Sequence, residues 1–234
     1  MYRRTLEGRE FTFGVSGMLL HNALLLFDRE TRTLWSHLTG EALAGPQRGK
    51  RLFRLQAAPV ASWEAIRQVQ PATQVLVVAG QQDVPLDSYL GYHADPGANG
   101  IRPVTHRDDR LPGKSLVLGV RAEGESRAYP LSRLSPASAL QDRLATVPLV
   151  VARDDASGIV VAYRRRVENR LLEFESRVEN GKVRDRTTGT TWDLIRGVGT
   201  AGSLAGRRLE AVDAIVLYWF GWVDYYPKTT VYGG

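Results

Sequence analysis

The order of apolar and polar positions predicts a chain built mostly of short β-strands. Residues 24–27, 115–120 and 126–131 are apolar or alternating runs of strand length, bounded by Gly, Pro and Asp. The same pattern recurs at residues 33–37, 50–56, 74–78, 148–151, 159–163, 190–194, 207–212 and 229–232. Many short strands separated by turn residues are typical of antiparallel sheets.

Two segments depart from this pattern and predict helices. Ser62 is a suitable N-cap for a helix with Glu64 in its first turn, which ends before Pro71. Residues 217–226 carry apolar side chains on most sides and end before Pro227, so they predict a short, buried helix. A shorter helical turn is expected at residues 87–92.

The pattern occurs twice along the chain. Residues 28–52 align without a gap with residues 185–209, and the alignment pairs Asp28/Asp185, Arg29/Arg186, Thr31/Thr188, Trp35/Trp192, Gly40/Gly197, Gly45/Gly202, Gly49/Gly206 and Leu52/Leu209. Residues 2–9 likewise align with residues 163–170, and each of these blocks predicts a β-hairpin. An internal repeat of this length indicates duplicated structural units.

The repeat predicts a mainly β protein (β-rich α+β) of two tandem homologous antiparallel-sheet units with short helices, related by a pseudo-two-fold axis. Residues 1–92 form repeat unit one, 93–113 a connecting loop rich in Pro, Gly and Asp, and 114–234 repeat unit two with a strand-rich lead-in. We expect the two units to pack around the tryptophans, which are Trp35, Trp63, Trp192, Trp219 and Trp222.

The lead-in of unit two, at about residues 114–162, has no counterpart before Tyr2. We therefore expect unit one to leave a sheet edge uncovered, through which the chain could associate with itself. The chain is expected to be short at its N-terminus for the same reason.

Composition narrows the functional classes. The 234 residues carry a net charge of +6, supplied almost entirely by arginine, but no nucleic-acid-binding motif accompanies the arginines, so nucleic acid is not an expected partner. The absence of cysteine excludes disulfides and thiolate chemistry. No apolar run has transmembrane length and no signal peptide is present, so the printed chain is expected to be soluble and cytoplasmic, although a missing N-terminus could hold an export signal.

Long motifs resemble a known family. The stretch FTFGVSGMLLHNALLLFDRETRTLWSHLTGEALAG, the helix that begins at Ser62, LVLGV followed by RAYPL, and WFGW followed by YYP resemble, in order, the bacterial and archaeal family called domain of unknown function 3179. The resemblance covers nearly the whole chain and implies no activity. Members usually carry a Cys-Pro-x-Cys type motif ahead of the first hairpin, which this chain does not contain.

Candidate catalytic residues occur only in the first copy. Ser16, His21 and Asn22 lie in an insertion that the second copy lacks, and His37 aligns with Leu194. Together with Asp28, the side chains of Ser16, His21 and His37 would suit a hydrolase if they converged, because a nucleophile needs a base and the base needs an orienting group. The simpler interpretation is that Ser16 forms a turn and that both histidines are structural.

Other candidates concern ligand binding. A cleft for a polar ligand could be lined by Asn22, the paired Asp28–Arg29 and Asp185–Arg186, Trp35 and Trp192. Each Asp could equally fix a turn, while each Arg lies beside the repeat Trp. Residues 197–202 match G-x-G-x-x-G without the strand–turn–helix context of a dinucleotide site. The loop with His93, His106, Asp108 and Asp109 has no recognised ligand spacing. We predict neither a cofactor nor a metal.

Two functional hypotheses follow. The first is a non-catalytic binding or interaction module that uses the cleft between its two copies to hold a small molecule or a protein. The second is a hydrolase-like enzyme with a site in copy one. Whether Ser16, His21, Asp28 and His37 meet in one pocket distinguishes the two hypotheses.

Overall fold

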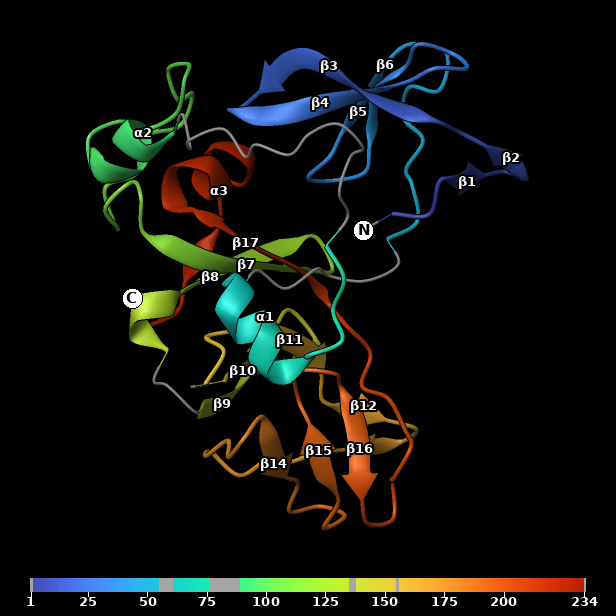
Figure 1. Ribbon diagram of the computed structural model, residues 1–234, viewed down its shortest axis with the longest axis vertical. Helices are drawn as coiled ribbons and strands as arrows, with labels where there is room; N and C mark the ends of the chain where they lie inside the picture. The colour runs from blue at the N-terminus through green and yellow to red at the C-terminus, as the bar shows by residue number, and fades with distance from the viewer. Residues whose placement is uncertain (1, 55–60, 76–88, 135–137, 155, 234) are drawn as a thin grey trace.

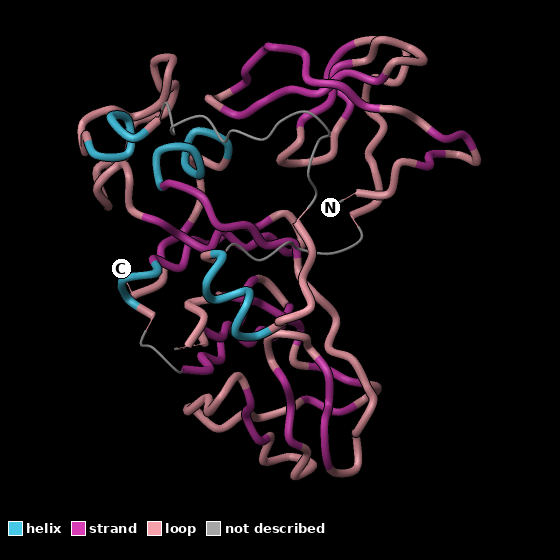
Figure 2. The backbone as a smooth tube through the Cα atoms, viewed as in Figure 1, coloured by secondary structure: helices cyan, strands magenta, loops and turns pink. Residues whose placement is uncertain are grey.

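The computed structural model describes residues 2–54, 61–75, 89–134, 138–154 and 156–233 (Figures 1 and 2). Most of its regular structure is antiparallel sheet, which confirms the predicted mainly β class. Within these residues no helix is long and apolar enough to cross a membrane.

The first sheet contains the first repeat block and lies at one end of the molecule (Figure 1). It has the order β3 (Phe13–Leu20), β4 (Ala23–Asp28), β5 (Leu34–Ser36) and β6 (Ala42–Ala44), and all its neighbours are antiparallel. The hairpin β1 (Thr5–Leu6) and β2 (Arg9–Glu10) precedes it. The register shifts between Val15 and Leu19, so the glycine-rich insertion is accommodated as an irregularity within β3.

A second sheet crosses the middle of the molecule (Figure 1). Its order is β17 (Asp213–Tyr218), β7 (Leu116–Ala122), β8 (Glu125–Pro130) and β18 (Thr230–Val231), and only the β18–β8 pair is parallel. We call it the central sheet. The next sheet consists of β9 (Ser138–Leu144), β10 (Val147–Arg153) and β11 (Val160–Arg164), with β10 in the centre.

The second repeat block lies at the opposite end of the molecule from the first (Figure 1). It begins with the hairpin β12 (Arg166–Val167) and β13 (Arg170–Leu171). The sheet β14 (Lys182–Arg184), β15 (Thr191–Asp193) and β16 (Val198–Ala201) follows. The assignment of residues 1–92 and 114–234 to two pseudo-two-fold units stays a prediction.

The helices are short: α1 (Trp63–Val69), α2 (Leu90–Ala94), α3 (Trp219–Tyr225) and the 3-10 turn η1 (Leu131–Arg133). Ser62 caps α1 through a hydrogen bond from the Ala65 amide, as predicted. Helix α3 packs on the central sheet, where Trp222 covers Gly119 of β7. A Cβ atom at position 119 would lie 2.3 Å from the Trp222 ring, so only glycine allows this close packing.

The tryptophans do not share one core, which corrects the expectation of a common packing centre. Trp35 belongs to the small core of the first sheet, Trp192 to the core of the second block, and Trp219 and Trp222 to the core between α3 and the central sheet. Trp63 is 48% exposed. The reason is that each repeat block closes its own core, while in α1 the small residue Ala65 is buried and Trp63 lies on an exposed face.

The two repeat blocks make the same hydrogen bonds. The indole nitrogen of Trp35 donates to the Asp28 carboxylate at 2.8 Å, and that of Trp192 donates to Asp185 at 2.7 Å. The amide of Thr31 donates to Asp28, as the amide of Thr188 does to Asp185. Each aspartate is fully buried, so the four bonds satisfy charges that would otherwise be costly in the core.

Several predicted elements differ from the observed ones. Strands β6 and β16 lie in segments for which no strand was predicted. Residues 207–212 form only isolated bridges, and residues 217–218 belong to β17 rather than to the following helix. The predicted strands 50–56 and 74–78 and the turn 87–92 extend into residues outside the described ranges; Arg51 and Arg54 form single bridges.

Trp192→Ala should lower the free energy of unfolding by about 3–5 kcal/mol, because it removes a fully buried indole and the hydrogen bond that the indole nitrogen donates to the buried Asp185. A urea titration followed by circular dichroism measures the change. Trp63→Ala is the matched control and should cost less than about 1 kcal/mol, because its side chain is half exposed. Equal effects of the two substitutions would contradict the core assignment.

Candidate functional site

A pocket of about 330 Å3 opens between the first sheet and the central sheet. One wall comes from the β3–β4 turn and the end of β5, and it includes His21, Asn22 and His37. The opposite wall consists of residues 215–218 of β17 with Phe220, Gly221 and Tyr225 of α3, and Tyr92 of α2 contributes an edge. The walls are therefore far apart in the sequence. They present both aromatic and aliphatic side chains, which are Tyr92, Tyr218, Phe220 and Tyr225 and Leu24, Leu38, Ile215, Val216 and Leu217.

The β3–β4 turn places His21 in this pocket. His21 and Asn22 both have positive φ angles, 48° and 60°, which is the backbone of a type I′ hairpin turn. Asn22 then exchanges two hydrogen bonds with the backbone of Arg102, at 3.0 and 2.8 Å. The turn is thereby tied to the connecting segment, and Asn22 has a structural role beside the pocket.

Behind His21 lies a buried carboxylate. Asp224 of α3 is 1% exposed, and its Oδ1 accepts hydrogen bonds from the backbone amides of Thr105 and His106, each at 2.8 Å. Its Oδ2 lies 3.3 Å from His21 Nδ1 but accepts no hydrogen bond from any described residue. One oxygen of this buried charge is thus held by the protein, while the other faces an imidazole.

All four histidines of the chain gather at this place. His21 and His37 line the pocket, and His93 Nδ1 lies 3.1 Å from the hydroxyl of the lining residue Tyr218. His106 Nδ1 lies 3.4 Å from Asp224 Oδ1. The ring centroids of His21 and His106 are 6.4 Å apart.

Burial affects two of the phenols that line the pocket, Tyr225 and Tyr92. Burial raises the pKa of Tyr225 above its ordinary value, and its hydroxyl donates to the Leu20 carbonyl at 2.9 Å. Burial also raises the pKa of Tyr92. The Tyr225 ring meets the His21 ring edge to face at 5.0 Å, which fixes the imidazole from a second side.

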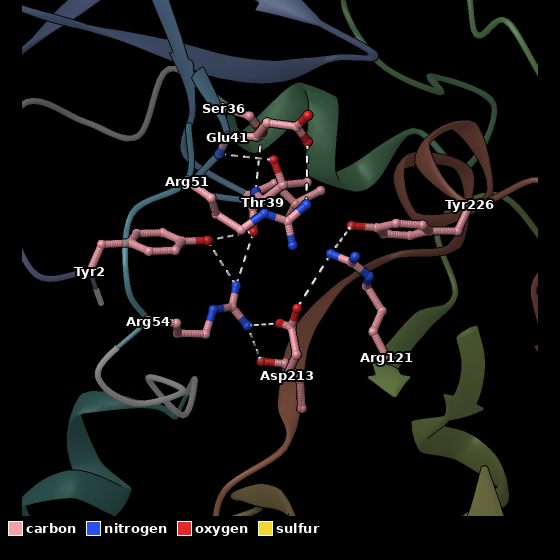
Figure 3. Close-up of polar contacts among 11 residues, drawn as sticks. Tyr2, Ser36, Thr39, Glu41, Arg51, Arg54, Arg121, Asp213 and Tyr226 are labelled. Atoms are coloured by element: carbon pink, nitrogen blue, oxygen red, sulfur yellow. Dashed lines mark hydrogen bonds and ion pairs between the residues drawn. The ribbon is translucent and has the colours of Figure 1, made fainter. Parts of the chain in front are cut away.

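A polar cluster closes the cleft beside the pocket (Figure 3). Asp213 of β17 forms ion pairs with both Arg54 and Arg121, and Arg54 also donates to the Tyr2 hydroxyl and the Leu38 carbonyl. Arg121 donates to the Tyr226 hydroxyl at 3.0 Å. We call Arg54, Asp213 and Arg121 the Asp213 clamp, because it joins the first sheet's end to the central sheet.

The clamp also sets the charge of its members. The pKa of Arg54 lies above its ordinary value: burial works against the charged form, but the negative charge of Asp213 and the Tyr2 hydroxyl outweigh it. Arg54 therefore remains a cation in its partly buried place, where it holds the Asp213 carboxylate.

The four candidate catalytic side chains do not meet. His21 and His37 share the pocket, but the Ser16 hydroxyl donates to the Leu25 carbonyl at 2.6 Å, and Asp28 is fully buried against Trp35. Asp28 and His21 lie at opposite ends of β4, roughly 17–20 Å apart along the strand. The acid that faces His21 is Asp224 instead.

The paired Asp–Arg residues also lie away from the pocket. Asp185 and Trp192 are fully buried partners, as Asp28 and Trp35 are. Arg29 lies over the ring of Phe27 at 5.8 Å, which corrects its expected place beside Trp35. The Arg186 amide donates to the Glu173 carbonyl. These residues shape the two blocks, and none of them lines the pocket.

Sequence reasoning missed Asp224, Tyr225 and the role of His106. The available signal was the single acidic residue within the apolar run WFGWVDYYP. A charged side chain that faces a packed core needs a partner, and here the Asp224 carboxylate accepts hydrogen bonds from the backbone of the connecting segment. Throughout the described residues, no group of three His, Cys, Asp or Glu side chains is arranged to hold a metal ion.

The comparisons with known proteins identify a family only. A family model described as "Protein of unknown function (DUF3179)" matches residues 1–229. Neither the curated proteins nor the solved structures include a match to this chain.

Asp28→Asn should destabilise the protein by about 1–3 kcal/mol at pH 7, and this difference should shrink at pH 3. Burial alone would raise the pKa of Asp28, but hydrogen bonds from Trp35, Thr31 and the backbone hold it below its ordinary value. Its stabilising effect is therefore present above the unfolded pKa of about 3.9 and is lost as the pH falls through the folded pKa. Urea titrations at both pH values measure it; an effect that grows in acid would contradict this assignment.

Asp213→Asn should lower the free energy of unfolding by about 1–2 kcal/mol, because it leaves two partly buried guanidinium groups without their shared carboxylate. The control is Glu41→Gln, which breaks the exposed pair with Arg51 that lies beside the clamp in Figure 3. That change should cost less than about 0.5 kcal/mol. Thermal and urea unfolding of both variants provide the comparison, and equal costs would contradict the clamp's role.

Proposed function

The chain belongs to the DUF3179 family, and from the geometry of its cleft we propose that it binds a small organic molecule in the pocket between the first sheet and the central sheet. The observation that carries the proposal is a pocket lined by two histidines and four Tyr and Phe rings, with the other two histidines beside it, His93 on Tyr218 and His106 on Asp224. Ligand sites are typically concave and largely apolar, with a few polar groups that fix orientation. This pocket has that composition.

The size of the pocket and its walls support a small ligand. A volume of about 330 Å3 lies at the lower end of the range of small-molecule sites. Phe220, Tyr218 and Tyr225 offer ring surface, while His21 and His37 offer polar atoms. The site also lies between sheet layers, which is a frequent place for ligand pockets.

We rank binding above hydrolysis. A hydrolase of the Ser–His–Asp kind needs its nucleophile within hydrogen-bond reach of the base, and Ser16 is bonded to the Leu25 carbonyl outside the pocket. Among the described residues, no serine, threonine or cysteine lines the pocket. The pair His21–Asp224 alone resembles a base with its orienting acid, and it would need water as the nucleophile.

A screen of small aromatic fragments by ligand-observed NMR tests the proposal. Ala23→Trp should block the pocket, since Ala23 lines it, and should weaken the binding of pocket ligands at least about tenfold. Ala205→Trp is the control, because Ala205 is exposed in the other repeat block. Thermal melts check that both variants fold. A screen without binders, or binders indifferent to Ala23→Trp, would overturn the proposal.

A further inference from the structure

We propose that the ligand of this pocket carries a positively charged amino group; this inference rests on the proposed binding function and specifies its chemistry. Three features of the site lead to it: the hydrogen-bonding state of His37, the buried carboxylate of Asp224 behind His21, and the aromatic rings of the walls. Each of these features favours a donor with positive charge over an anion.

The partner of one pocket imidazole fixes which of its ring nitrogens carries hydrogen. His37 Nδ1 lies 2.6 Å from the Leu24 carbonyl oxygen, which can only accept, so Nδ1 must carry the hydrogen. In the neutral His37 ring, Nε2 is then left as an acceptor, which suits a ligand that donates hydrogen bonds. His21 Nδ1 lies 3.3 Å from Asp224 Oδ2 and 3.5 Å from the Thr105 hydroxyl.

The carboxylate of Asp224 favours a cationic ligand over a neutral hydrogen-bond donor. Its side chain is fully buried, and Oδ2 has no hydrogen-bond donor among the described residues. A buried carboxylate in this state favours positive charge nearby, and the low polarity of its surroundings strengthens that attraction. His21 lines the pocket and Asp224 does not, so Asp224 acts on the ligand through His21, as a positioning residue.

The aromatic walls favour the same chemistry. Tyr218, Phe220 and Tyr225 line the pocket, and the faces of such rings attract ammonium groups. The chain already contains one example at the pocket edge, where the Lys114 ammonium lies 3.8 Å from the Tyr92 ring centroid. Lys114 itself does not line the pocket, and the part of the lining that the structure describes contains no arginine or lysine that could hold an anion. We therefore place the ligand's amino group at the end of the pocket near His21 and Tyr225.

Three probes with one ring and different charge test the inference: benzylamine, benzyl alcohol and benzoate, titrated into the full chain at fixed ionic strength by NMR or calorimetry. Benzylamine should bind at least about tenfold more tightly than benzyl alcohol, a factor that corresponds to about 1.4 kcal/mol. Benzoate should bind most weakly. Because this preference is measured on the unchanged protein, it does not depend on whether any variant folds.

Asp224→Asn should reduce the preference for benzylamine over benzyl alcohol about tenfold, and the protein should still fold, since the amide oxygen can still accept from the backbone of Thr105 and His106. Asp109→Asn is the control, because Asp109 is exposed on the same connecting segment and its loss should leave the preference intact. A preference that survives Asp224→Asn would overturn the role of this charge.

The other outcomes separate this inference from the proposed function. Tighter binding of benzoate would show a pocket for anions, and equal binding of amine and alcohol would show a pocket indifferent to charge. Either result overturns the amine inference, while binding that is lost in Ala23→Trp still supports the pocket as a binding site. If no probe binds at millimolar concentration, the amine inference fails, and the fragment screen decides the binding function separately.

Discussion

The shared carboxylate of Asp213 is the contact on which the arrangement of this protein depends. The first sheet has its own small core around Trp35, separate from the cores of the central sheet and the second block. Polar contacts link it to three other parts of the chain: the Asp213 clamp to the central sheet, the Tyr225–Leu20 bond to α3, and the bonds of Asn22 to Arg102. The clamp thereby fixes the distance between the two walls of the pocket.

A junction of this kind has a physical consequence for binding. Polar contacts in a partly exposed place contribute modestly, because water competes for each partner. The junction is therefore weaker than the apolar core that contains Trp222, and the pocket lies at this weaker junction. A ligand that contacts both walls would add its own binding energy to the clamp and stabilise the folded arrangement.

The connecting segment is part of the site. Residues 95–115, loop throughout in Figure 2, would read as a simple link between units, yet their backbone binds Asp224 at Thr105 and His106 and binds Asn22 at Arg102. These bonds satisfy backbone groups that a sheet would otherwise pair. The segment also supplies His106, so the histidines meet only because this loop is folded over α3.

The sequence alone determined the local structure of both repeat blocks. Asp28, Thr31 and Trp35, repeated as Asp185, Thr188 and Trp192, specify a turn and a strand through contacts within seven residues, so a motif is enough to predict them. It also indicated the hairpins, two of the helices and the candidate status of His21 and His37. Trp63 was misplaced because local pattern does not reveal which helix face meets a core. Only the tertiary structure paired His21 with Asp224 and Arg54 with Asp213, since those partners lie more than 150 residues apart and their meeting depends on how the sheets stack.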